Sequence, residues 1–327
     1  MALSAQALQY TDDGLTELTS QPDPGEGDLS MPWMRRVQVP ATASRGEVVV
    51  WRELINATSV GVNTRRAPGH ARNQIFLGDP STVAYETNER SLDIFLDYVE
   101  IGRAQSPIDV QVMAARKVRR VVELSRYKAV RDLLTTTANW GGNNNAAITA
   151  IGGSGVALSN ASSTPFVDYE LAAQACADQN GNRRPDYVIL SDRAITLMAT
   201  VGLRNVLPLD KTPVREIRQQ YTVDALADHL GFAVHMERAF ENNSRLWPAT
   251  AVFGYNAGAI APTNNGAIVP PMTAALIQEQ VPNYITGDIV ISVREKEDGT
   301  GLIITCITSD DPLAVDTEAI FLLTGNY

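Results

Sequence analysis

The sequence is poor in cysteine and has no long apolar run, and both absences narrow the class of protein. Only Cys176 and Cys306 occur in 327 residues, without a CxxC pair or a histidine at ligand spacing, so neither a disulfide framework nor a zinc site is expected. No apolar run reaches about 18 residues, and the first residues, MALSAQALQYTDDGLTEL, lack the basic start and apolar centre of a signal peptide. We therefore expect a soluble, cytosol-made protein without a membrane partner.

Common catalytic and nucleotide-binding motifs are also missing. There is no GxxxxGK, no GxGxxG after a strand, no HExxH and no GxSxG. The GGSG at 152–155 is expected to be a flexible loop, and the acid pair Asp310–Asp311 is expected in a solvated turn. We expect no enzyme activity, no catalytic residue, no cofactor and no metal.

Charge is distributed unevenly along the chain. Residues 1–34 hold six acids and no base, residues 35–131 hold sixteen bases and ten acids, and the remainder holds eleven bases and twenty-one acids. Ordinary surface variation would produce such a pattern. Equally, the basic segment of one copy could meet an acidic segment of another, because complementary potentials steer association.

The first hundred residues predict an arm followed by a protruding loop. Residues 1–46 carry four prolines and little periodicity, so they read as an extended arm that needs a partner surface for its burial. EVVVWRELI and TVAYETNERSLDIFLDYVEIG have the residue types of two long strands. Between them lies a polar tip with Arg65, Arg66, His70 and Arg72.

One long helix is predicted over 106–136. Ser106 suits the N-cap, Pro107 the first helical position and Asp109 the third. The apolar side is a narrow stripe at three- and four-residue steps, which suits packing on a single sheet. Its members are Ile108, Val112, Ala115, Val118, Val122, Ser125, Ala129 and Leu133, and Arg116, Lys117, Arg120, Lys128 and Arg131 form a basic face opposite.

The remaining chain alternates helices and strands before returning to strands. We predict a helix over 166–178, a buried strand at DYVIL, a helix capped by Ser191 and another capped by Thr222 and ended by Gly231. DIVISVREKEDGTGLIITCITS reads as a β-hairpin with a two-residue turn at Asp298–Gly299. This hairpin is the expected support of the long helix, and TEAIFLLTG is the expected last strand.

This order of parts resembles the major capsid proteins of tailed double-stranded DNA bacteriophages. The most similar stretches are RRPDYVILSDRAITLMATVG, YTVDALADHLGFAVHMERAF and LWPATAVFGYNAG. The resemblance covers essentially the whole chain and implies an α+β fold of the HK-ninety-seven type. It further implies an N-terminal arm at 1–46, an extended loop at 47–103, a peripheral domain with the spine helix at 104–165, an axial domain at 166–275, and a peripheral β return with the C-terminal strand at 276–327.

The resemblance implies a protein that works by geometry. Many copies would form hexamers and pentamers of an icosahedral shell around packaged double-stranded DNA, with a portal and separate scaffolding or decoration proteins as further partners. Its location would be the virion capsid, assembled in the bacterial cytoplasm. Candidate contacts between subunits are Arg65, Arg66, Arg72, Arg116, Arg120 and Arg131. The first lysine is Lys117, in the long helix, so a covalent link from a loop lysine is not expected.

Two other interpretations remain open. An encapsulin-like compartment shares the fold but encloses enzymes. A cytosolic α/β hydrolase would need a catalytic set, and Ser191 with His229 or His235 and Asp210 is the one set that the sequence offers, without a motif to support it.

Overall fold

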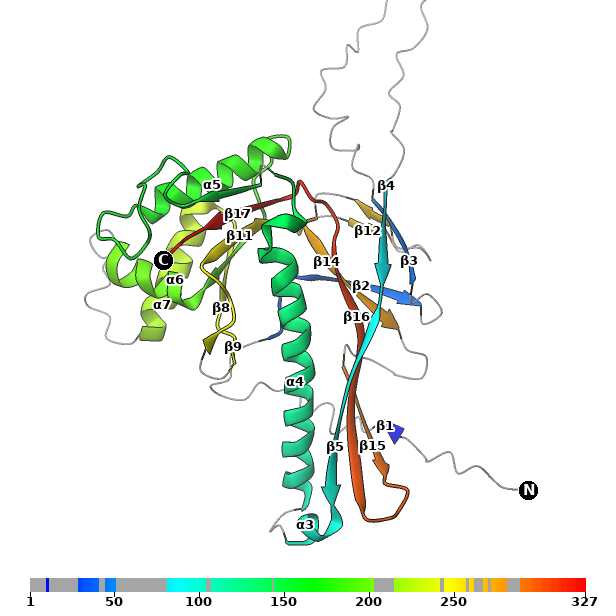
Figure 1. Ribbon diagram of the computed structural model, residues 1–327. Helices are drawn as coiled ribbons and strands as arrows, with labels where there is room; N and C mark the ends of the chain where they lie inside the picture. Colours follow the sequence, from blue (N-terminus) through cyan, green and yellow to red (C-terminus); the bar gives the residue numbers. More distant parts are fainter. Residues whose placement is uncertain are drawn as a thin grey trace, which may run out of the picture.

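In the computed structural model the described residues are 10–11, 29–40, 45–50, 81–103, 107–142, 144–202, 215–241, 244–256, 259–261, 267–269, 272–280 and 289–327. They form an elongated sheet part and a compact α/β part, joined by one long helix (Figure 1). Among them no helix combines the length and apolar character needed to cross a bilayer.

The elongated part is a sheet of six strands centred on β16 (Gly301–Ala314). β15 (Val290–Glu295) pairs with residues 302–307 of β16 and β5 (Asn88–Asp97) with residues 301–310, both antiparallel, while β14 (Ala274–Gln280) pairs with residues 310–314. β2 (Arg35–Pro40) runs parallel to β14, and β1 (Tyr10–Thr11) pairs with β15. The predicted hairpin is thus confirmed.

The hairpin turn differs from the predicted two-residue type. The last hydrogen bond between the two strands runs from Lys296 N–H to the carbonyl oxygen of Gly301, at 2.9 Å. Within the connection, Gly299 has a positive φ of 68°. Because Gly299 N–H also bonds to Lys296 O, the connection is a longer loop, in which Asp298 accepts hydrogen bonds from Thr300 N and Oγ1.

The α/β part is a five-stranded mixed sheet with helices on one face (Figure 1). Its order is β6 (Asn145–Ala147), β17 (Ile320–Thr324), β11 (Thr250–Gly254), β7 (Tyr187–Ser191) and β8 (Ala233–Glu237). The helices are α5 (Pro165–Gln179), α6 (Asp192–Leu197), continued by a π-helical turn at Met198–Gly202, and α7 (Arg215–Leu230). The resemblance implies that the C-terminal strand belongs to the same unit as the hairpin, but this strand pairs with β11 and β6.

Most local signals in this part are confirmed, and one is wrong. Ser191 Oγ caps α6 by accepting from Ala194 N at 3.1 Å, and Gly231, with a φ of 76°, ends α7. Thr222 does not begin a helix. It lies inside α7, fully buried, and its hydroxyl donates to Arg218 O one turn earlier.

The Gly–Ser loop at 152–155, which the sequence predicted to be flexible, is hydrogen-bonded to α5. Ser154 donates from its N–H at 2.6 Å and from its hydroxyl at 2.7 Å to the carboxylate of Asp168 in α5, which is fully buried. A Cβ on Gly153 would overlap Asp168 Oδ1. The glycine is therefore needed for the close approach of the loop to the carboxylate.

The long helix is α4 (Pro107–Thr135), in agreement with the prediction. The side chains of Ser106 and Asp109, which carry the predicted cap, lie outside the described residues. Its 29 residues span about 44 Å. In Figure 1 the helix reaches from the far end of the elongated sheet to the α/β part.

The buried side of α4 rotates along its length, which the predicted straight stripe did not include. Ala115, Val118 and Val122 pack in one cluster with β5, β15 and β16. Further on, Tyr127, Val130 and Leu134 pack with residues of β7, β11 and β17 instead, whereas Ser125 of the predicted stripe is exposed. The helix turns a different side inward because its second half meets the other sheet.

Part of the expected arm is built into the core of its own chain. Leu29, Met31 and Trp33 are at most 4% exposed and join the cluster around the second half of α4. The following residues form β2. For residues 29–40, the expectation that burial needs a partner is therefore wrong.

The extended loop is described only at its base. β3 (Arg45–Val50) and β4 (Ser81–Glu86) pair antiparallel, and β13 (Ala267–Val269) adds to β3 in parallel, followed by β12 (Ala259–Ala261). The predicted strand after the loop ends at Asp97, because α3 (Tyr98–Arg103) follows, with Val99 N bonded to Asp97 Oδ1 at 2.7 Å. Two short strands, β9 (Phe240–Glu241) and β10 (Ser244–Arg245), and a 3₁₀ turn at Thr137–Asn139 complete the elements.

Candidate functional site

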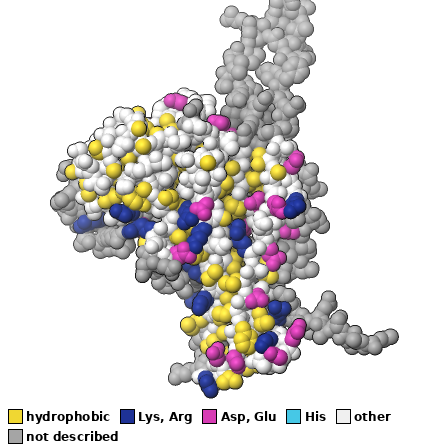
Figure 2. Space-filling view, viewed as in Figure 1, with side chains coloured by type: hydrophobic (Ala, Val, Ile, Leu, Met, Phe, Trp, Pro, Cys, Tyr) yellow, Lys and Arg dark blue, Asp and Glu magenta, His cyan; other side chains and the backbone are white. Residues whose placement is uncertain are grey.

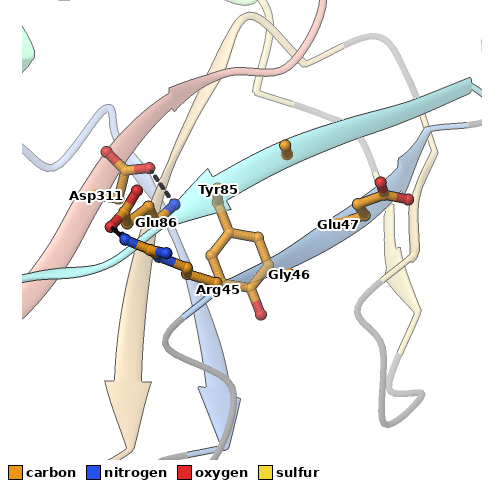
Figure 3. A pocket seen from close by; sticks show the side chains of 7 residues that line it. Arg45, Gly46, Glu47, Tyr85, Glu86 and Asp311 are labelled. Carbon is orange, nitrogen blue, oxygen red and sulfur yellow. Dashed lines mark hydrogen bonds and ion pairs between the residues drawn. The ribbon is translucent and has the colours of Figure 1, made fainter.

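A shallow hollow of about 730 Å³ lies at the base of the extended loop (Figure 3). β3 and β4 supply most of its lining, and β16 adds Asp311 from the neighbouring sheet. We call the part of this surface formed by Arg45, Glu47, Glu86 and Asp311 the loop-base face. Tyr85 lies beside it, with its ring against Gly46, where any Cβ would collide with the phenol.

Carboxylates outnumber cations on the loop-base face. Arg45 forms an ion pair with Glu86, and the two residues are register partners on β3 and β4. Asp311 accepts one hydrogen bond, from Glu86 N at 3.1 Å. Burial raises the pKa of the Asp311 carboxyl, and the nearby Asp310 and Glu86 carboxylates raise it further, against the Glu86 N–H bond and Arg90, which lower it.

The adjoining segment joins the loop base to the elongated sheet. One residue, Thr87, separates β4 from β5, and its hydroxyl donates to Glu279 Oε2 at 3.3 Å. Next to it, the fully buried Asp310 accepts from Arg90 Nε at 3.1 Å. Asp310 and Asp311 thus lie inside β16 and not in the solvated turn that the sequence predicted. The charge of the buried Asp310 is compensated by Arg90.

A second polar site joins α4 to the N-terminal arm and to the α/β sheet. Glu237 at the end of β8 is 7% exposed, and its two oxygens accept from Trp33 Nε1 at 2.6 Å and from Tyr127 Oη at 2.7 Å. Trp247 packs edge-on against both rings, with centroids 6.0 and 6.4 Å away. One carboxylate therefore joins the arm, the long helix and the α/β sheet.

The arginines that were predicted as contacts fall into two groups. Arg65, Arg66 and Arg72 lie outside the described residues. Arg116 and Arg120 are half-buried on α4, and Arg131 bonds inside its own chain, to Asp132 Oδ1 at 2.6 Å and to Leu246 O at 3.2 Å. Figure 2 shows Lys and Arg side chains over the middle of α4 and along the lower margin of the α/β part, with acidic side chains among them. A role in contacts between subunits stays a prediction for all six arginines.

The residues of the hydrolase alternative are used in packing. Ser191 Oγ is the α6 cap, and the His229 ring lies 4.7 Å from that of Phe166. His235 lies opposite Ile189 in the β7–β8 register, and burial lowers its pKa. Asp210 lies outside the described residues. The described residues contain no group of three or more His, Cys, Asp or Glu placed to hold a metal ion.

Sequence reasoning missed the loop-base face. Its four charged residues come from three strands, and Asp311 is 225 positions away from Glu86. The available signal was weak: Arg45 lies just before the first predicted loop strand, and Glu86 lies near the start of the second. Antiparallel pairing of those strands brings their outer ends together.

Comparison with known proteins gives a fold and no closer relationship. No protein-family model matches the sequence, and no curated protein matches it. A phage-related protein from Bordetella bronchiseptica RB50 has a similar structure, with a TM-score of 0.63 and 16% identity over 97% of this chain and 98% of that chain. A proposed capsid protein of a prophage in Escherichia coli CFT073 gives 0.53 at 10% identity, over 97% and 99% of the two chains. A virus-like particle from Pyrococcus furiosus gives 0.52 at 10% identity, over 94% and 95%.

At such low identities these likenesses show the fold alone. They extend over nearly the whole length of both chains, so no large part of this chain lies outside the shared architecture. The chain therefore has the α+β fold of phage capsid proteins, the HK-ninety-seven type that the resemblance implied. The division into five domains stays a prediction.

Proposed function

We propose that this chain is the major capsid protein of a tailed double-stranded DNA phage. Copies of it would assemble into hexamers and pentamers of an icosahedral shell that encloses the genome. The observation that carries the proposal is the likeness over at least 97% of this chain to a phage-related protein and to a proposed prophage capsid protein. Its location would be the virion capsid, after assembly in the bacterial cytoplasm.

The shape of the described part supports this role. It is a long sheet and an α/β part, each packed on one half of α4, with a loop base projecting from the side (Figure 1). A molecule of this elongated form can make repeated heterologous contacts, which close into rings when the rotation between copies allows it. We propose that the function is this assembly and not catalysis, and that a portal, separate scaffolding or decoration proteins and packaged DNA are further partners.

The proposal predicts large particles from the chain expressed by itself or with its neighbouring genes. On size exclusion the protein should elute in the megadalton range, and electron micrographs should show closed shells of uniform diameter. A chain that remains a monomer or small oligomer at all concentrations, with or without those genes, would contradict the proposal.

An encapsulin-like compartment is the second candidate. The likeness to a virus-like particle from Pyrococcus furiosus supports a closed particle, which such a compartment would also form. The contents of purified particles distinguish the two: a phage capsid should contain nuclease-protected double-stranded DNA when packaging genes are present, and a compartment should contain a cargo protein instead.

A further inference from the structure

The connection between β4 and β5 joins the base of the loop to the elongated sheet, and it is crowded with carboxylates. We propose that this connection is a proton-sensitive latch within one chain: protonation of Asp311 tightens the hold of the elongated sheet on the loop base, and ionisation of Asp311 loosens it. The latch belongs to the fold of the single chain and does not depend on whether copies of the chain form a shell.

Two carboxylates of the elongated sheet bond to two consecutive residues of the connection. Asp311 of β16 accepts from the backbone N–H of Glu86, the last residue of β4, at 3.1 Å (Figure 3). Glu279 of β14 accepts from the hydroxyl of Thr87, the one residue between β4 and β5, at 3.3 Å, and from Ser309 Oγ at 2.8 Å. We call the contacts on Glu86 and Thr87 the junction latch.

Carboxylates outnumber cations around the junction latch, and both cations are engaged by other carboxylates. Arg45 is paired with Glu86, and Arg90 is paired with Asp310. Among the residues that the structure describes, no cation bonds directly to the half-buried Asp311. The charged groups from the strands around the junction latch are Arg45 and Glu47 of β3, Glu86 of β4, Arg90 of β5, Glu279 of β14 and Asp310 of β16.

The balance of these effects favours a proton on Asp311. Burial raises the pKa of its carboxyl, and the Asp310 and Glu86 carboxylates raise it further, whereas the Glu86 N–H bond and Arg90 lower it. Because the net direction is upward, the closed latch binds this proton more tightly than an open latch with Asp311 in water. The stabilisation is therefore complete below the ordinary pKa of an aspartic acid and is lost as the pH rises through the raised pKa.

Protonation relieves repulsion without breaking the contact. A carboxylic acid keeps acceptor capacity, so Asp311 can still accept from Glu86 N–H. The ionised form makes the stronger individual bond, because a charged acceptor strengthens it. The upward pKa of Asp311 shows that burial and the neighbouring carboxylates outweigh this gain.

Hydrogen exchange at Glu86 reports the junction latch directly, because the Glu86 N–H is the group that Asp311 holds. A substitution at position 311 leaves the intrinsic exchange rate of Glu86 unchanged, since the two residues are far apart in sequence. Mass spectrometry of overlapping peptides that differ in residue 86 gives its protection factor, measured on the full chain in one assembly state.

Asp311→Asn imitates the protonated form and keeps an oxygen acceptor for Glu86 N–H. At pH 7.5 the Glu86 protection factor should be about two- to fivefold higher in Asp311→Asn than in the parent chain, the size expected from removing a like charge between neighbouring strands. In the parent chain protection should rise toward the value of the variant as the pH falls to 5, and the variant should lose this dependence on pH. Glu297→Gln, an exposed acid-to-amide change in the hairpin loop, is the matched control and should behave as the parent chain.

Three results would overturn the proposal. One is parent protection at Glu86 that does not rise at pH 5, a measurement that needs no variant. Another is an Asp311→Asn chain, folded by circular dichroism, whose protection at pH 7.5 is no higher than that of the parent. The third is a Glu279→Gln variant that abolishes the pH dependence while Asp311→Asn keeps it, because the proton would then be on Glu279. None of these results bears on the proposed shell function, which size exclusion tests separately.

Discussion

Replacing Tyr127 with Phe tests whether Glu237 holds the arm, the helix and the α/β sheet together. The substitution removes the hydroxyl that donates to Glu237 Oε2 at 2.7 Å and keeps the ring that packs on Trp247. Burial, and then the Glu237 carboxylate, raise the pKa of Tyr127 well above its usual value, so the hydroxyl remains a donor at every practical pH. A hydrogen bond to a charged group contributes about 1.5–3 kcal/mol, and we expect a loss of that size in the free energy of unfolding.

Urea unfolding of the unassembled chain, followed by far-UV circular dichroism, measures this loss. Tyr221→Phe is the matched control, because Tyr221 is 45% exposed on α7 and should lose less than about 0.5 kcal/mol. Trp33→Phe should also destabilise, and the two losses should not be additive, because both donors share Glu237. A Tyr127→Phe variant as stable as the Tyr221→Phe control would refute the reasoning.

Two further predictions concern the buried interior. Gly153→Ala should lower the unfolding free energy by about 2 kcal/mol or more, because a Cβ there would overlap Asp168 Oδ1. Gly142→Ala, the control with open space around it, should change the unfolding free energy by less than about 0.5 kcal/mol in the same urea titration. Burial raises the pKa of Cys176 and of Cys306 to about 12, so both thiols should stay unreactive toward a thiol reagent at pH 8 and react fully after denaturation. Rapid labelling of the folded chain would show that the packing described around these thiols is wrong.

Local signals in the sequence predicted the elements well where one residue type decides the geometry. Ser191 caps the start of α6, and Gly231, with its positive φ, ends α7. The hairpin of β15 and β16 was also predictable, because its strands are close in sequence and rich in β-branched residues. The fold class came from the resemblance of the order of these elements to that of phage capsid proteins.

Contacts between distant segments could not be predicted in this way. The rotation of the buried side of α4 depends on which sheet each half meets, and those sheets are completed by strands after residue 289. Asp310 looked like a surface residue because acids are rare in buried strands. Its partner, Arg90, lies 220 positions earlier, so no local pattern reveals the pair.

The packing of α4 indicates which parts of this chain could shift relative to one another in the proposed shell. Its first half shares a core with β5, β15 and β16, and its second half shares a core with β7, β11 and β17. Tilting one sheet against the other would therefore open one of these cores, and each buried apolar side chain exposed would cost about 1.5–3 kcal/mol. A contact between exposed charges on two copies costs far less to adjust. If copies of this chain form five- and six-membered rings, as proposed, we expect the differences between the rings to be accommodated at the contacts between copies, while the two sheets keep the same relative orientation.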